Sequence, residues 1–313
     1  MLSRTADNLY WLARFMERAE STARIIDAAQ RLATMPQATG SSTNEWQSAV
    51  ATAGCTVAFK SKYPQADART VTDFLAFSPE NSASIKHCVE TARTNARAVR
   101  TALTGEMWDA INSAWYEVRR FDPAKTHGEE LARFLSLVKE SSLRFDGAAF
   151  RTMLRNDAYC FSRLGILIER ADATARILDV KYHVLLPEQA QVGGPLDYFQ
   201  WVSILRSVSA RASYHWVYRD SVKPWLVADL LILNRQMPRS LASCYENMSR
   251  YLDDLAQFYG RQGNSQRIAR SMLTKLSNAS MEDIFQSGLH EFINSFIADN
   301  NRLGAAITEQ YLV

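Results

Sequence analysis

Two segments of this chain repeat one another closely enough to constrain its fold. Residues 15–28 read FMERAESTARIIDA, and residues 167–180 read LIERADATARILDV. When residues 17–27 are compared with the segment 152 positions later, eight of eleven positions are identical: Glu, Arg, Ala, Thr, Ala, Arg, Ile and Asp. Self-similarity of this kind predicts a structural unit that occurs twice.

The repeated segment has the apolar spacing of an amphipathic helix. Apolar residues recur at intervals of three and four positions, which places them in one stripe along a helix. The stripe consists of Leu9, Leu12, Met16, Ala19, Ala23 and Ile26, and in the second copy of Phe161, Leu164, Ile168, Ala171, Ala175 and Leu178. Each copy therefore needs a partner element that covers its apolar side.

A second pair of segments extends the repeat. Residues 71–90 match residues 227–246 at an offset of 156, and the two matching blocks occur in the same order in both halves of the chain. This match pairs Asp73 with Asp229, Leu75 with Leu231, Ser84 with Ser240, Cys88 with Cys244 and Glu90 with Glu246.

Because helical periodicity dominates and alternating strand patterns are scarce, we predict an all-α fold. We expect a tandem duplication of an antiparallel helical bundle, with two halves related by a pseudo-twofold axis. The expected repeats are residues 1–147 and 148–313, with a boundary near Asp146 and Gly147, packed together as one unit.

Composition excludes several classes of protein. The 313 residues carry a formal net charge of only +3 and contain no basic block, so we expect no nucleic-acid partner. No span of about 18 apolar residues occurs, and charges interrupt the N-terminal segment, so we expect neither a transmembrane helix nor a signal peptide. The four cysteines form no CxxC pair, which favours a reducing cytoplasm over a disulfide framework or a zinc site.

The charged positions retained in both copies are not explained by hydrophobicity. The candidate cluster consists of Glu17, Arg18, Arg24, Glu169, Arg170 and Arg176, with Tyr10 and Arg14 as secondary members. Solvated positions would have been free to diverge, as Tyr10 did to Ser162 and Arg14 did to Ile166. The retained charges therefore indicate something other than free surface.

Two interpretations of this cluster remain open. In the first, each glutamate forms a structural ion pair, and the adjacent arginine reaches a different helix. In the second, two carboxylates and up to four guanidiniums converge near the pseudo-twofold axis and bind a carboxylate or phosphate of a peptide-like ligand.

Other candidate sites have weaker sequence support. His87 and Cys88 are helical neighbours that point about 100° apart, so they do not form a nucleophile and base pair. The histidines lack metal-ligand spacing, and the Gly193-Gly194-Pro195 turn lacks the lysine of a phosphate loop, so we expect no metal and no cofactor. The aromatic residues between positions 198 and 225 favour core packing, with an exposed docking patch as the alternative.

Two stretches of the sequence resemble a known family. MLSRTADNLYWLARFMERAESTARIID at the N-terminus and FSRLGILIERADATARILDVKYHVLLP at residues 161–187 are similar to the signature segments of the bacterial Alpha-E family, long catalogued as a domain of unknown function. The resemblance covers essentially the whole chain and implies an all-helical, duplicated protein with a Glu-Arg motif. One departure is visible: this chain has Leu164-Gly165-Ile166 where the second signature usually reads Leu-Gly-Arg.

The resemblance implies a biological context rather than a reaction. Alpha-E proteins are associated with ATP-grasp-type ligases and transglutaminase-like proteins in a proposed peptide synthesis or modification system. We therefore expect a non-catalytic helical partner of such a ligase or of its peptide substrate. The alternatives are an enzyme that acts on an anionic peptide-like substrate through the duplicated Glu-Arg site, and a purely structural homo-oligomer.

Overall fold

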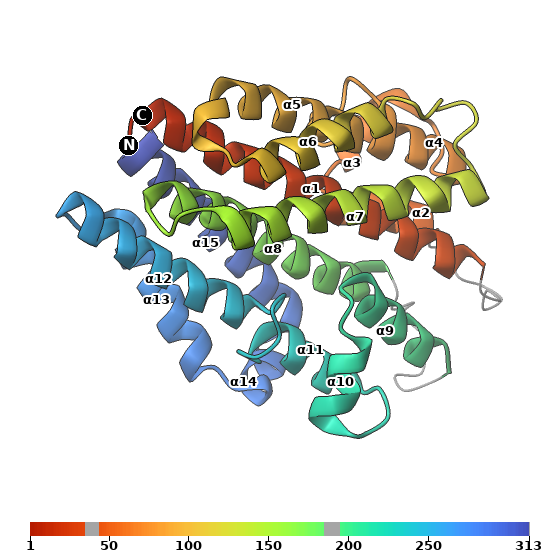
Figure 1. Cartoon of the computed structure of the whole chain (residues 1–313). Helices are drawn as coiled ribbons and strands as arrows, with labels where there is room; N and C mark the ends of the chain where they lie inside the picture. Colours follow the sequence, from red (N-terminus) through yellow and green to blue (C-terminus); the bar gives the residue numbers. More distant parts are fainter. Residues whose placement is uncertain (35–43, 185–194, 313) are drawn as a thin grey trace.

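The regular elements of the protein are helical. The computed structural model describes residues 1–34, 44–184 and 195–312, and no strand occurs among them (Figure 1). This confirms the predicted all-α class for the described residues. The α-helices are α1 (Ser3–Ala33), α2 (Glu45–Thr52), α3 (Thr56–Lys62), α4 (Ala68–Thr72), α5 (Ile85–Ala98), α6 (Gly105–Val118), α7 (Glu129–Thr152), α8 (Asp157–Val184), α9 (Pro195–Ser207), α10 (Arg211–Tyr218), α11 (Pro224–Ile232), α12 (Leu241–Tyr259), α13 (Asn264–Asn278), α14 (Met281–Ser287) and α15 (Leu289–Ile307). A 3₁₀ turn, Arg100–Ala102, and two π-helical turns, Asp73–Phe77 and Thr308–Leu312, complete the secondary structure.

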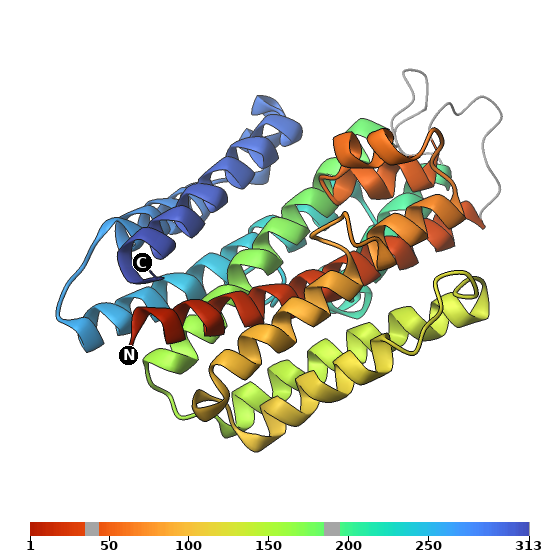
Figure 2. The ribbon, with the colours of Figure 1, turned by 90° about the horizontal axis from the view of Figure 1, so that it is seen from above.

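The two long helices α1 and α8 run side by side through the middle of the molecule. Figure 2 shows α1 in red and α8 in green, with α6 and α7 on one side of them and the blue C-terminal helices on the other. These two helices carry the repeated segments FMERAESTARIIDA and LIERADATARILDV. Tyr10 and Ala13 of α1 lie against Gly165 of α8, and Arg170 of α8 donates a hydrogen bond to Glu17 of α1. Equivalent positions thus meet along the pair, so the helices run in the same direction.

The backbones of α1 and α8 approach most closely at Gly165. A Cβ atom at this position would lie 2.3 Å from the carbonyl oxygen of Tyr10 and 3.1 Å from the Cβ of Ala13. Only glycine leaves room for the carbonyl, because any side chain would push the helices apart. The small residue therefore sets the distance across which the charged side chains of the two helices meet.

Each central helix packs on two longer helices of its own half, and a third helix packs on those two. Helix α1 contacts α5 and α7, with α6 packed between those two helices, and α8 contacts α12 and α15, with α13 packed between them. The shorter helices α2 and α9 each contact both α1 and α8. The buried apolar side chains of these elements form one continuous cluster. The two halves therefore share one core.

Residues matched by the sequence comparison occupy similar places in their halves. Ser84 caps the N-terminus of α5, and Ser240 caps that of α12; each hydroxyl accepts a backbone N–H three residues later. Asp73 accepts a hydrogen bond from the phenol of Tyr63, and Asp229 accepts one from the phenol of Tyr218. Cys88 and Cys244 are both fully buried.

The expected boundary between residues 147 and 148 needs correction. It falls inside α7, which continues without a break from Glu129 to Thr152; the chain leaves helical conformation only at residues 153–156. Gly147 suggested a break, but it is part of the continuous helix, and a Cβ added to it would have nothing within 4 Å. Asp146 is held in the helix by ion pairs to Arg163 and Arg170 of α8. Tertiary contacts thus override the weak helix propensity of these two residues.

Within the described parts of the chain, no helix is both long enough and apolar enough to cross a bilayer.

Candidate functional site

The Glu-Arg dipeptides of α1 and α8 bind each other reciprocally. Arg18 donates from Nε and Nη2 to the two carboxylate oxygens of Glu169, at 2.5 and 2.9 Å. Arg170 donates from the same two atoms to the oxygens of Glu17, at 3.0 and 2.8 Å. Both pairs have the fork geometry that makes arginine–carboxylate bonds strong and directional. Each half of the chain therefore supplies the counter-ion of the other half's glutamate.

A second arginine completes the coordination of each glutamate. Arg14 of α1 donates from Nε to Glu169 at 3.0 Å, and Arg239 donates from Nη1 to Glu17 at 3.0 Å. Arg239 precedes the N-cap of α12, and its own carbonyl accepts a 2.9 Å hydrogen bond from Thr174 of α8. Every oxygen of the two carboxylates thus accepts at least one charge-assisted hydrogen bond.

The glutamates are buried but remain ionised. The side chain of Glu17 is 2% exposed and that of Glu169 is 8% exposed. Burial alone would raise the pKa of Glu17, but Arg170 and Arg239 outweigh burial and lower this pKa to about 2. Glu169 behaves in the same way: Arg18 and Arg14 overcome the effect of burial, so its pKa lies below the ordinary value. Both carboxylates therefore stay charged at neutral pH.

The distal arginines of the motif make a second set of contacts between the halves. Each first pairs with an acid four residues earlier on its own helix: Arg24 with Glu20 at 2.7 Å, and Arg176 with Asp172 at 2.6 Å. Arg24 also donates to the carbonyl of Ser207, the last residue of α9, at 3.1 Å. Such a cation satisfies a free carbonyl and the negative end of the helix dipole.

Arg176 occupies the corresponding place over the other half. Its Nη1 lies so near the end of α2 that a Cβ on Gly54 would be 2.9 Å away. Gly54 has φ +69°, and Ser209, which bonds Arg24 through its hydroxyl at 2.9 Å, has φ +57°. The chain therefore makes a left-handed turn under each distal arginine.

This arrangement matches the description of one protein family. A family model described as a predicted alpha-helical domain with a conserved ER motif matches residues 1–312. The chain belongs to the Alpha-E family. In this Alpha-E protein the Glu-Arg dipeptide occurs twice, at residues 17–18 and 169–170. No curated protein and no solved structure matched the chain in the same comparisons.

The candidate residues of this Alpha-E protein are brought together only in part. Glu17, Arg18, Glu169, Arg170 and Arg14 form the central network described above. Arg24 and Arg176 do not bind those glutamates and instead pair with acids on their own helices. Tyr10, predicted as a secondary member, is fully buried between the helices, and this burial raises its pKa.

Three charged members of the network were missed. Glu20 and Asp172 lie four positions before the distal arginines, and this retained acid–arginine spacing was a signal that could have identified them. Arg239 gave no such signal, because Ala83 stands at the matching position of the first half. Arg239 binds both Glu17 and Glu20 of α1, and only folding brings this distant arginine next to them.

Two buried thiols lie near the network of this Alpha-E protein. Burial raises the pKa of Cys88 and of Cys244 to about 12, despite the nearby positive charges of Arg18 and Arg170. A thiol becomes a nucleophile only as the thiolate. Both therefore serve as core side chains at neutral pH.

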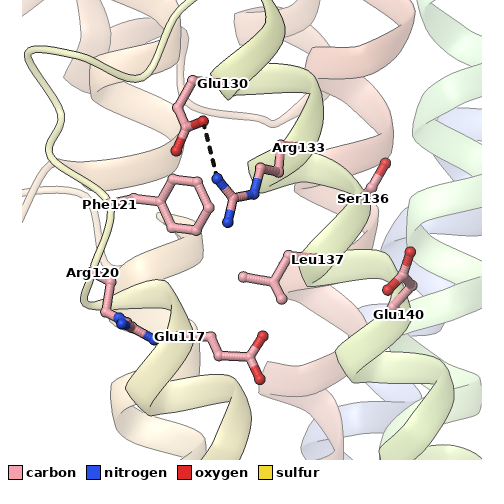
Figure 3. Close-up of a pocket in the computed structure, with 8 residues that line it drawn as sticks. All are labelled: Glu117, Arg120, Phe121, Glu130, Arg133, Ser136, Leu137 and Glu140. Carbon is pink, nitrogen blue, oxygen red and sulfur yellow. Dashed lines mark ion pairs between the residues drawn. The ribbon is translucent and has the colours of Figure 1, made fainter.

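The ligating side chains of the described residues do not gather into a metal site. No group of three or more His, Cys, Asp or Glu side chains in those parts of the chain could hold a metal ion. A surface hollow lies between α6 and α7, far along the chain from the Glu-Arg dipeptides, and Figure 3 shows its side chains. There Glu130 pairs with Arg133 at 3.5 Å. The hollow mixes charges of both signs and is separate from the motif.

Proposed function

We propose that the two halves arose by tandem duplication and are related by a pseudo-twofold axis running along α1 and α8. Three observations support this proposal. The two sets of helices pack in the same order, and matched residues cap or brace matched helices. The two Glu-Arg dipeptides also exchange partners, as a twofold relation requires.

We further propose that the protein is a non-catalytic helical partner protein whose Glu-Arg motif joins its two halves. The observation that carries this proposal is the saturation of Glu17 and Glu169 by four guanidinium donors from both halves. A general base needs a free lone pair and a pKa near the working pH. Glu17 is buried, bonded through both oxygens and has a pKa of about 2, so it is unsuited to proton abstraction.

The proposed partner is an ATP-grasp-type ligase or its peptide substrate, within a peptide modification system that includes transglutaminase-like proteins. Membership of the Alpha-E family supports this choice of partner. A cytoplasmic location belongs to the same proposal and is supported by the four cysteines, all of which are free thiols.

Co-purification tests the partnership. The protein and the ATP-grasp-type ligase of the same organism are co-expressed, with an affinity tag on the ligase only. We expect the two chains to elute together in a fixed ratio and the ligase to turn over faster in the complex. Failure of both co-elution and stimulation would refute the partnership. Native mass measurement of the protein alone tests the homo-oligomer alternative, which predicts a mass of two or more chains.

A catalytic role for the motif is tested with the matched variants Arg18→Lys and Arg170→Lys. Each keeps the positive charge but loses the fork geometry. A catalytic or substrate-binding arginine would lose activity in a stably folded variant. We call the reciprocal pairing of Glu17 with Arg170 and of Glu169 with Arg18 the interlock of the two halves. A purely structural interlock predicts that the variants are less stable but still stimulate the ligase at temperatures where they stay folded.

A further inference from the structure

Helices α9, α10 and α11 of the second half expose aromatic side chains, whereas α2, α3 and α4 of the first half expose none. Trp216 of α10 is 79% exposed, Trp225 of α11 is 52% exposed and Phe199 of α9 is 50% exposed. Helix α10 packs on both α9 and α11, so the three helices form one projecting edge of the molecule (Figure 1). Exposed aromatic clusters of this kind mark interaction surfaces.

Core packing does not account for these side chains. Tyr214, on the inner side of α10, is the aromatic residue of this helix that packs in the core. It is fully buried, and its hydroxyl donates to the carbonyl of Ser221 and accepts from the backbone N–H of Lys223. Trp216 lies two positions further on, about 200° around the helix, and therefore points away from the core. The aromatic cluster at residues 198–225 is thus divided between an inner part that packs and an outer part that faces solvent.

The matching positions of the first half show which residue types the fold accepts there. In the register that places Tyr63 with Tyr218, Trp216 and Val217 correspond to Ser61 and Lys62. In the register of the helix starts at Ala68 and Pro224, Trp225 corresponds to Arg69. Polar residues therefore suffice at these places in α3 and α4. The aromatic residues of the second half need a different reason.

The segment that carries the exposed aromatic residues is rich in cations. Residues 199–225 contain Arg206, Arg211, Arg219 and Lys223 against one acid, Asp220, a net charge of +4 − 1 = +3. The corresponding residues 44–70 contain three cations and two acids, a net charge of +3 − 2 = +1. Arg206, Arg211 and Arg219 are exposed and make no ion pair with the described residues. The edge is therefore both more apolar and more positive than its counterpart.

Two backbone positions at this edge break local rules. Arg219 ends α10 with φ +50°, a left-handed conformation that favours glycine. Lys223 stands at the N-cap of α11, where the helix dipole disfavours a positive charge and where the first half has Asp67. Departures of this kind concentrate at functional surfaces.

We propose that this edge, defined by Trp216, Val217, Trp225 and the cations Arg206, Arg211 and Arg219, is a docking surface for an acidic protein partner. Trp and Arg are the residues enriched at interface hot spots, and the surplus of cations selects a surface rich in Asp and Glu. The projecting edge fits a concave, carboxylate-lined site on the partner. Resting on the function proposed above, the inference assigns the ATP-grasp-type ligase to this edge.

The experiment compares variants taken from the protein's own first half. Trp216→Ser and Trp225→Arg introduce the residues found at positions 61 and 69. Val57→Ser is the control, because Val57 is an 86% exposed apolar residue of the first half, outside the edge. Affinity for the purified ligase is measured by titration at about 50 and 200 mM salt. Since all three positions are exposed, circular dichroism and the melting temperature should match those of the unmodified protein.

We expect Trp216→Ser to weaken ligase binding at least about tenfold and Val57→Ser to change it less than about twofold. Binding of the unmodified protein should weaken as salt rises, and Arg211→Glu should reduce that salt dependence. If the complex forms and both tryptophan variants bind normally, the docking surface is wrong while the proposed function stands. If the unmodified protein does not bind the ligase at all, the proposed function itself fails, and the assignment of this edge fails with it.

Two further measurements detect other occupants of the edge. Binding to phosphatidylcholine vesicles containing one-quarter phosphatidylglycerol, lost in Trp216→Ser, would assign the edge to a membrane surface and overturn the proposal. Self-association in sedimentation velocity, lost in the same variant, would assign it to a second copy of the chain and overturn the proposal equally. We expect neither signal.

Discussion

Arg239 donates a 3.0 Å hydrogen bond to Glu17, although 222 positions separate the two residues in the chain. This contact bears on the departure at Ile166, where the second half lacks the counterpart of Arg14. Arg14 is the second donor to Glu169, and Arg239 is the second donor to Glu17. Each glutamate therefore has two arginines, but the second arginine comes from a different element in each half.

Removal of Arg239 should destabilise the protein more than removal of Arg14. The Arg239 side chain is 12% exposed and binds two carboxylates, those of Glu17 and Glu20, whereas that of Arg14 is 19% exposed and binds one, that of Glu169. Arg239→Ala takes one of two guanidinium partners away from each of two buried carboxylates, so we expect a loss of about 2–4 kcal/mol in the free energy of unfolding. Arg14→Ala should cost about 1 kcal/mol. Urea titration measures both, and the reverse order would show that Arg239 is not the stronger partner.

Gly165→Ala should be strongly destabilising. The added Cβ would meet the carbonyl oxygen of Tyr10 at 2.3 Å, so α1 and α8 must separate. We expect a loss of at least about 2 kcal/mol from this overpacking. The matched control is Gly147→Ala on α7, where nothing lies within 4 Å of the new Cβ. Alanine is the better helix former, so the control should gain about 0.5–1 kcal/mol. Equal effects at the two glycines would contradict the close helix approach.

The stability of the protein should fall in acid as the glutamates of the network take up protons. The pKa of Glu17 is about 2 in the folded protein against an ordinary value of 4.5. Its stabilising contribution is therefore fully present above about pH 4.5 and is lost as the pH falls toward 2. At about 1.4 kcal/mol per pKa unit, this contribution is on the order of 3 kcal/mol.

Thermal unfolding between pH 7 and pH 3 measures this dependence. The control is Glu17→Gln, which should be less stable at neutral pH and should lose less stability on acidification than the unmodified protein. An identical pH profile in the two proteins would show that Glu17 is not held ionised by its arginines.

The sequence was sufficient for the helices but not for the contacts between them. The spacing of residues such as Leu12 and Met16 predicted the buried side of α1, because apolar periodicity is a local property. Retention of Glu17 and Arg18 in both halves indicated that their charges were not free surface, and both prove to be ion-paired between helices. The partner of each charge could not be predicted, because the sequence does not tell which of its many arginines the packing brings next to each glutamate.

Two features were not predicted from the sequence, for physical reasons. No contact of Thr174 was predicted, yet its hydroxyl donates to the carbonyl of Arg239, whose side chain binds Glu17. The boundary near Gly147 was placed by local propensity, whereas Asp146 is bound to α8 and the helix continues. Both depend on contacts between segments distant in sequence.

A double-mutant cycle between Glu17 and Arg170 tests the interlock most directly. Urea unfolding is measured for Glu17→Gln, Arg170→Met and the double variant, with Glu130 and Arg133, an exposed pair three residues apart on α7, as the control cycle. Reciprocal pairing of the two halves predicts a coupling energy of about 1–3 kcal/mol for Glu17 and Arg170, against about 0.3–0.5 kcal/mol for the control. A coupling no larger than that of the control would contradict the interlock.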